Sequence, residues 1–137
     1  MKKIMFAIAI IGAIILGIVA KADATNVRLY FSITIKDTCN GGGYTGSYIA
    51  QLKLFYDGTY ICTGIVTNIP IGGPTCTYYI CDITYIASDK KYQVELLQVT
   101  RSDGSCELTV NQLESGFYWS DVTDQYCNTT PSFSITL

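Results

Sequence analysis

The rest of the chain is organised around YQVELLQVTRSDGSCELTVNQL, residues 92–113. Two runs of alternating apolar and polar residues flank Asp103-Gly104, a dipeptide typical of two-residue hairpin turns. With this dipeptide at the centre of the turn, the segment is predicted to be a β-hairpin with Arg101 opposite Cys106. Its apolar face is predicted to hold Leu97, Val99, Leu108 and Val110, and its wet face Gln98, Thr100, Glu107 and Thr109.

A second hairpin is predicted upstream, where the runs Tyr48–Tyr56 and Thr59–Thr67 flank Asp57-Gly58. Pairing the two strands across this central dipeptide predicts which side chains share a face. One face holds Ala50, Leu52, Leu54, Ile61 and Ile65, and the opposite face holds Gln51, Lys53, Cys62 and Gly64.

The remaining chain also divides into strands and breaks. The predicted strands are Val27–Lys36, Cys76–Ala87, Phe117–Val122 and Ser132–Leu137, and the predicted breaks are Asp37–Gly46, Asn68–Pro74, Ser88–Lys90, Glu114–Gly116 and Thr123–Pro131. Cys76–Ala87 is rich in Tyr, Ile and Thr, so it could be buried on both faces. No segment shows an apolar face at helical spacing.

About seven to eight strands with closely spaced turns predict an all-β, antiparallel β-sandwich, immunoglobulin-like or transthyretin-like and stapled by disulfides. Gly64–Tyr79, a strand followed by Asn-Ile-Pro-Ile-Gly-Gly and a Tyr-rich strand, resembles transthyretin-like and carboxypeptidase-regulatory-like modules. Pro74 and Cys76 interrupt that pattern. The resemblance implies a fold and no activity.

The first 24 of the 137 residues read as a secretory signal peptide. Lys2 and Lys3 precede the apolar run Ile4–Ala20, and Ala22-Asp23-Ala24 fits a cleavage site. The alternative is an uncleaved N-terminal anchor, because the run is almost long enough to span a bilayer. We expect cleavage after Ala24, a single domain over residues 25–137, and no membrane span after cleavage.

Six cysteines follow the predicted signal: Cys39, Cys62, Cys76, Cys81, Cys106 and Cys127. An even number in an exported chain predicts three disulfides, although six cysteines allow 15 connectivities and the sequence does not choose among them. A structural zinc site is disfavoured because the chain has no histidine and no Cys-x-x-Cys pair. We therefore predict no metal and no cofactor.

After removal of Lys2, Lys3, Lys21 and Asp23, six basic and ten acidic residues remain, giving a net charge of −4. Nucleic acid and anionic membrane surfaces attract basic patches, so neither is an expected partner.

Residue types suited to catalysis are scarce. Histidine is absent, and disulfide-bonded cysteines are not nucleophiles. The exceptions are Glu114, Asp121 and Asp124, which could act as paired carboxylates in a small secreted hydrolase or lytic factor, or could bind calcium. A solvated loop explains these acids more simply. Tyr118 and Trp119 are the best candidates for ligand contact, with Trp119 as a core residue in the alternative interpretation.

The sequence alone does not identify the function. The leading expectation is a secreted, periplasmic or cell-surface module without enzymatic activity that binds a protein or glycan partner or assembles with copies of itself. The alternatives are the hydrolase described above and an inhibitor of a secreted enzyme. Val27–Lys36 could complete the sheet of a neighbouring copy, although pairing within its own domain is favoured. Function is expected in the Gly41–Gly43 loop, the Phe117–Pro131 region or the terminal strands.

Overall fold

A computed structural model describes residues 25–83, 91–118, 127 and 131–137. These residues form seven β-strands and one short 3-10 helix. The elements are β1 (Thr25–Lys36), η1 (Cys39–Gly41), β2 (Tyr48–Tyr56), β3 (Thr59–Ile69), β4 (Gly72–Ile83), β5 (Lys91–Arg101), β6 (Glu107–Tyr118) and β7 (Ser132–Thr136). Within the described ranges, no helix is long and apolar enough to cross a membrane.

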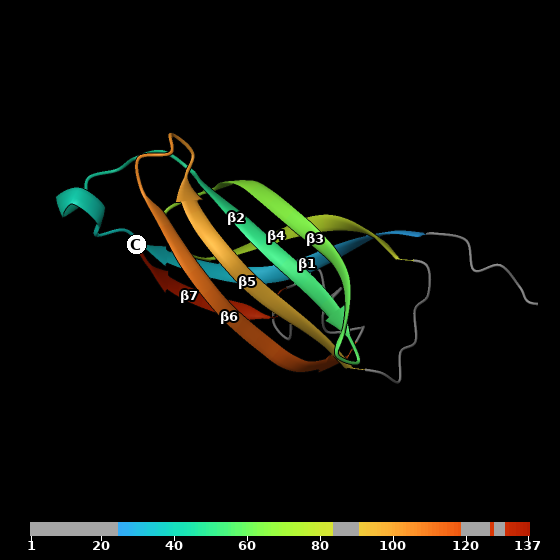
Figure 1. Ribbon diagram of the computed structural model, residues 1–137. Helices are drawn as coiled ribbons and strands as arrows, with labels where there is room; N and C mark the ends of the chain where they lie inside the picture. Colours follow the sequence, from blue (N-terminus) through green and yellow to red (C-terminus); the bar gives the residue numbers. More distant parts are fainter. Residues whose placement is uncertain (1–24, 84–90, 119–126, 128–130) are drawn as a thin grey trace, which may run out of the picture.

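The strands form two packed sheets, with the order β4-β1-β7 in one and β3-β2-β5-β6 in the other (Figure 1). The predicted all-β sandwich is therefore confirmed. Neighbouring strands are antiparallel except β1 and β7, which run parallel. β1 lies between β4 and β7 of its own chain, as the favoured interpretation of Val27–Lys36 predicted.

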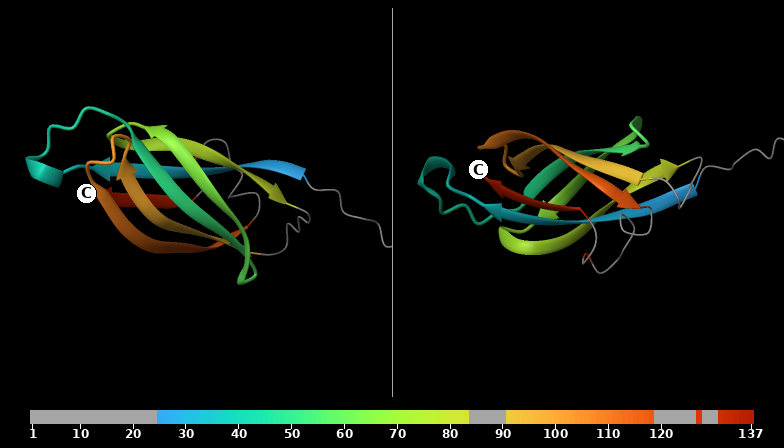
Figure 2. Two further views of the ribbon diagram at one scale, coloured as in Figure 1. Left: turned by 45° about the horizontal axis from the view of Figure 1, so that its top comes forward. Right: turned by 90° about the horizontal axis from the view of Figure 1, so that it is seen from below.

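The two sheets lie as facing layers (Figure 2). Alternating side chains from both sheets fill the space between them. The sheet of β1, β4 and β7 contributes Leu29, Phe31, Ile33, Ile35, Tyr79, Cys81, Phe133 and Ile135. The facing sheet contributes Tyr48, Ala50, Leu52, Leu54, Val66, Ile69, Tyr92, Val94, Leu96 and Val99. The predicted alternation of Val27–Lys36 is confirmed, because its odd-numbered side chains from Leu29 to Ile35 are all buried.

The β5–β6 hairpin has the predicted register near its turn, where Val99 faces Leu108 and Gln98 faces Thr109. Its loop is longer than predicted, because the Arg101 carbonyl accepts from the Gly104 amide and Ser102–Ser105 all lie outside the strands. The Arg101 amide donates to the Cys106 carbonyl, which confirms that pairing.

Farther from the turn the register shifts by one residue around Leu97. The hairpin pairing predicts Val110 opposite Leu97, but Leu97 has no partner in the register of β5 with either β2 or β6. An extra residue of this kind is a β-bulge, and it reverses which side chains point inward. Leu96 and Val99 are therefore both fully buried, whereas Leu97, Leu108 and Val110 are only partly buried. The predicted apolar face is correct for Val99 and wrong for Leu97.

The β2–β3 hairpin turns at Asp57-Gly58, as predicted, and both residues have the positive φ (47° and 78°) that this turn requires. A register shift at Ile61 then places Leu54 opposite Cys62. Beyond that shift, Gly64 and Val66 face the core and Ile65 faces solvent. The prediction that Ile65 is a core residue, with Cys62 and Gly64 on the opposite face, is wrong for this reason.

Two further predictions are corrected. Glu114–Gly116 is not a turn, because β6 continues to Tyr118 and absorbs an extra residue there as a register shift. β4 buries one face only, since Tyr79 and Cys81 are buried and Ile80 is exposed. Glycine tolerates the irregular backbone of a bulge, so a glycine within a strand pattern can mark either a turn or a bulge.

All six cysteines are paired in three disulfides, as the sequence predicts. Cys39–Cys106 ties the segment after β1 to the start of β6, and Cys62–Cys81 joins β3 to β4 across the two sheets. Cys76–Cys127 joins β4 to the segment before β7.

Candidate functional site

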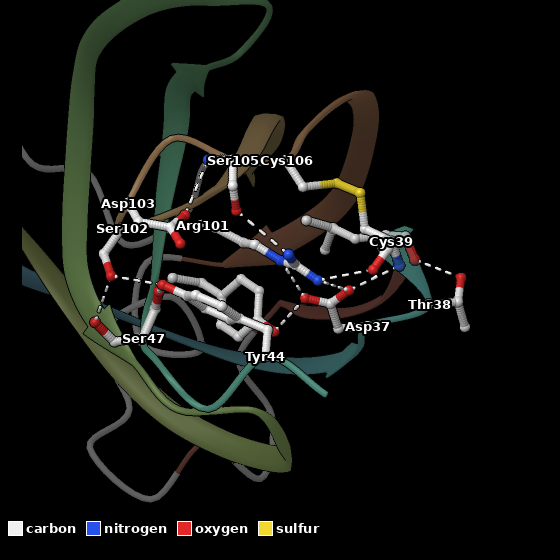
Figure 3. Close-up of polar contacts among 12 residues, drawn as sticks. Asp37, Thr38, Cys39, Tyr44, Ser47, Arg101, Ser102, Asp103, Ser105 and Cys106 are labelled. Atoms are coloured by element: carbon white, nitrogen blue, oxygen red, sulfur yellow. Dashed lines mark hydrogen bonds and ion pairs between the residues drawn. A yellow bond between two sulfur atoms is a disulfide. The ribbon is translucent and has the colours of Figure 1, made fainter. Parts of the chain in front are cut away.

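An ion pair between Asp37 and Arg101 lies at the end of the sandwich that carries η1 and the C-terminus (Figure 3). Arg101 Nε donates to Asp37 Oδ2 and Arg101 Nη2 donates to Asp37 Oδ1, each at 2.8 Å. Both side chains are buried, with 7% of the Arg101 side chain and none of the Asp37 side chain exposed. This bidentate geometry is the strong form of a carboxylate–guanidinium contact.

Further hydrogen bonds complete this Asp37–Arg101 cluster. The Tyr48 hydroxyl donates to Asp37 Oδ2 at 2.6 Å, and the Cys39 amide donates to Asp37 Oδ1 at 2.9 Å. Arg101 Nη2 also donates to the Cys39 carbonyl, and its guanidinium lies 4.5 Å from the centre of the Tyr44 ring. Because the Cys39–Cys106 disulfide closes the same corner, the cluster holds the loop after β1 against the β5–β6 hairpin (Figure 3).

The electrostatics of the cluster follow from these contacts. The hydrogen bonds from Arg101 hold the pKa of Asp37 well below its usual range. Burial, together with the nearby Asp37 carboxylate, raises the pKa of Tyr48 to about 12. Asp37 therefore stays ionised and Tyr48 stays protonated near neutral pH. Neither group is poised to exchange a proton at that pH, so the cluster is suited to stabilising the corner rather than to acid–base chemistry.

A groove of about 490 Å³ runs between the β3 and β4 edges. It is lined by Ile65, Val66 and Thr67 of β3 and by Thr77, Tyr78, Tyr79 and Ile80 of β4. Val66 and Tyr79 are buried, whereas Ile65 and Ile80 are 63% and 60% exposed, more than any other large apolar side chain of the described ranges. We refer to these seven residues as the β3–β4 groove.

Tyr79 packs closely against β3 within this groove. A Cβ added to Gly64 would lie 2.6 Å from two carbons of the Tyr79 ring, so only glycine leaves room for the ring. The Tyr79 hydroxyl is buried and finds no hydrogen-bond partner among the described residues. Burial also raises the pKa of this hydroxyl, so it remains a neutral group, and no described residue compensates for its burial.

Two smaller hollows lie on the outer face of the β3-β2-β5-β6 sheet. One, of about 180 Å³, is lined by Ile49, Gln51, Ile65, Gln98 and Thr100. The other, of about 190 Å³, is lined by Phe55, Gly58, Gln93, Glu95 and Leu113. Ile65 lines both the first hollow and the β3–β4 groove, so it is the side chain at which the two surfaces meet.

Of the predicted site residues, Tyr118 is 45% exposed at the end of β6, with Lys91 Nζ 5.6 Å from the centre of its ring. Trp119 lies outside the described residues, and so do Asp121 and Asp124. Glu114 lies on β6 and accepts a hydrogen bond from Gln112 Nε2 at 2.8 Å. The ligand-contact site and the three-acid site therefore both stay predictions.

The predicted Asp37–Gly46 loop is confirmed in position and in its attachment at Cys39. Gly41, Gly42 and Gly43 all have positive φ, which explains the triple glycine by backbone geometry. No group of three or more potential metal ligands occurs within residues 25–83, 91–118, 127 and 131–137.

The β3–β4 groove is not predicted from the sequence, because the alternation of β3 predicts Ile65 as a core residue. The available signal was the absence of charge, since no residue of β3 is charged and β4 has only Asp82 near its end. Comparisons with protein-family models, with curated proteins and with solved structures found no significant match to this chain. Function is therefore argued from the site alone.

Proposed function

We propose that the chain is an extracellular β-sandwich module without enzymatic activity, and that it binds through the β3–β4 groove or assembles through it. The observation that carries this proposal is the exposure of Ile65 and Ile80 along two strand edges whose only charged residue is Asp82, near the end of β4. Exposed edges with apolar side chains are templates for strand addition, and proteins usually blunt them with charges, proline or short strands. β3 has no charge and no proline, and β4 has them only near its ends, at Pro74 and Asp82, so the middle of this side of the sandwich is open to a binding role.

Three disulfides support an extracellular location, since such bonds form and persist in oxidising compartments. The predicted signal peptide over residues 1–24 agrees with this location. The secreted, periplasmic and cell-surface alternatives remain open within the proposal.

The binding experiment uses exported protein with a fluorescent label. It measures saturable binding to three immobilised probes: the protein itself, a panel of polysaccharides and a panel of secreted proteins. Ile80→Lys places a charge in the groove, and Leu113→Lys places the same charge on β6, where Leu113 is also about half exposed. We expect saturable binding to at least one probe, lost in Ile80→Lys and retained in Leu113→Lys.

Equal binding by both variants, or no saturable binding by the unmodified protein, contradicts the proposal. The hydrolase alternative is tested on the same preparation with glycoside, ester and peptide substrates. Turnover that disappears in Glu114→Ala, without loss of thermal stability, would replace the proposed function by an enzymatic one.

A further inference from the structure

The four sheet edges differ in how they are protected. Among the described residues, β6 carries Glu107 and Glu114, β7 has only five residues, and β4 carries Pro74 and Asp82 near its ends. Charges, proline and short length all oppose pairing with another chain. β3 is eleven residues long and has neither a charge nor a proline, and it forms a regular ladder with β2 from Cys62 to Val66, with a register shift at each end of that ladder. β3 and β4 lie together along one side of the sandwich, opposite β6 and β7 (Figure 1).

The outward-facing residues of β3 form a symmetric row. Thr63, Ile65 and Thr67 are all exposed, and the row reads the same in both directions from Ile65. In an antiparallel pairing centred on Ile65, this isoleucine faces its own copy and Thr63 faces Thr67 of the second copy. Pairs of β-branched residues and Thr–Thr pairs directly opposite each other stabilise antiparallel sheets. A two-fold axis requires self-complementarity of this kind.

Charge also favours a second copy of the chain at this edge. The protein is acidic, with a net charge of −2 for the full sequence, so two copies repel each other at most approaches. The β3 edge contributes no charge to this repulsion, whereas a β6–β6 pairing would bring Glu107 and Glu114 of two copies together. The uncharged edge is thus the approach that costs least electrostatically.

We infer that two copies of this chain pair through β3, antiparallel and centred on Ile65, so that the two four-stranded sheets become one continuous sheet. This inference rests on the proposed function and names the partner of the same groove. A single pair of edges is small beside the roughly 800 Å² per partner of a standard interface. We therefore expect a weak dimer with a micromolar dissociation constant.

The test is sedimentation velocity of the exported protein from about 1 μM to about 1 mM, a range that brackets micromolar affinity. Ile65→Lys and Ile65→Glu each place like charges opposite each other across the axis. Each variant alone should be monomeric, and an equimolar mixture should form a heterodimer because the charges are then opposite. Leu113→Lys should dimerise as the unmodified protein does. Thermal unfolding of each variant at low concentration verifies that it is folded.

The inference is overturned if the unmodified protein stays monomeric over the whole concentration range. It is also overturned if the Ile65→Lys variant still dimerises. A mixture of the two Ile65 variants that stays monomeric, although the unmodified protein dimerises, overturns the pairing centred on Ile65. A monomer that still binds a polysaccharide or a secreted protein through the groove overturns this inference while leaving the proposed function in place.

Discussion

Gly64 offers a direct test of how closely β4 packs on β3. In the structure a Cβ at this position would lie 2.6 Å from Cγ and Cε2 of Tyr79, and closer still to Cδ2. Carbon atoms in contact normally sit 3.5–4.0 Å apart, so in Gly64→Ala the ring or the strand has to move by about 1 Å or more.

The expected size of the effect follows from two opposing contributions. Overpacking of this kind costs roughly 1–3 kcal/mol, and replacing a strand glycine by alanine returns roughly 0.5–1 kcal/mol of conformational entropy. Gly64→Ala should therefore lower the free energy of unfolding by roughly 1–2 kcal/mol. For a domain of about this size, each kcal/mol corresponds to a fall of about 4–8 °C in the melting temperature.

A double-mutant cycle with Tyr79→Ala isolates the contact. Because the ring is gone in that background, Gly64→Ala should be neutral or slightly stabilising there. The measurement is urea unfolding of all four proteins with the disulfides intact. A Gly64→Ala variant as stable as the original protein, or one that loses the same stability with and without the Tyr79 ring, would refute the packing described for the groove.

Three other predictions concern single contacts. Tyr48→Phe should lower the free energy of unfolding by roughly 1.5–3 kcal/mol, because it removes a hydrogen bond to an ionised carboxylate. Tyr79→Phe should raise the free energy of unfolding by roughly 1 kcal/mol, because it removes a buried hydroxyl that no described residue satisfies. Equal effects of the two substitutions in denaturant unfolding would contradict both assignments. The folded-state pKa of Asp37 lies below the unfolded value of about 3.9, so its contribution to stability is present above about pH 4 and is lost as the pH falls below that. The stability difference between the original protein and Asp37→Asn should then narrow from pH 5 to about pH 2, and a constant difference in urea midpoints would refute this prediction. The Cys62→Ser/Cys81→Ser variant should lose roughly 3 kcal/mol, the chain-entropy value for its sequence separation of 19, as measured by thermal unfolding, and an unchanged melting temperature would count against that estimate.

The sequence predicted what depends on local chemistry. Asp57-Gly58 is a turn because both residues adopt positive φ, and the alternation of β1 predicts its buried face correctly. The pairing of Arg101 with Cys106 also follows from the turn position. These features depend on residues close together in the chain, where backbone preferences and the two-residue repeat of a strand act directly.

The features that the sequence missed depend on bulges and on distant residues. Single extra residues at Ile61 and Leu97 reverse the inward-facing positions, and nothing in their side chains distinguishes them from ordinary strand residues. The regular alternation therefore predicts Ile65 in the core, whereas the bulge places it on the surface. The contact between Asp37 and Arg101 joins residues 64 positions apart, and only the folded topology brings them together. The parallel pairing of β1 with β7 has the same origin.

Pairing of β3 with a second copy of the chain can be detected strand by strand by amide hydrogen exchange monitored by NMR. In an edge strand every second backbone N–H points away from the neighbouring strand and exchanges with solvent. We predict that alternate amides between Cys62 and Thr67 become slower to exchange as the protein concentration rises, while the amides of the opposite edge strand β6 do not change. Exchange rates in β3 that are independent of concentration up to about 1 mM, where even a weak dimer would form, would contradict the claim.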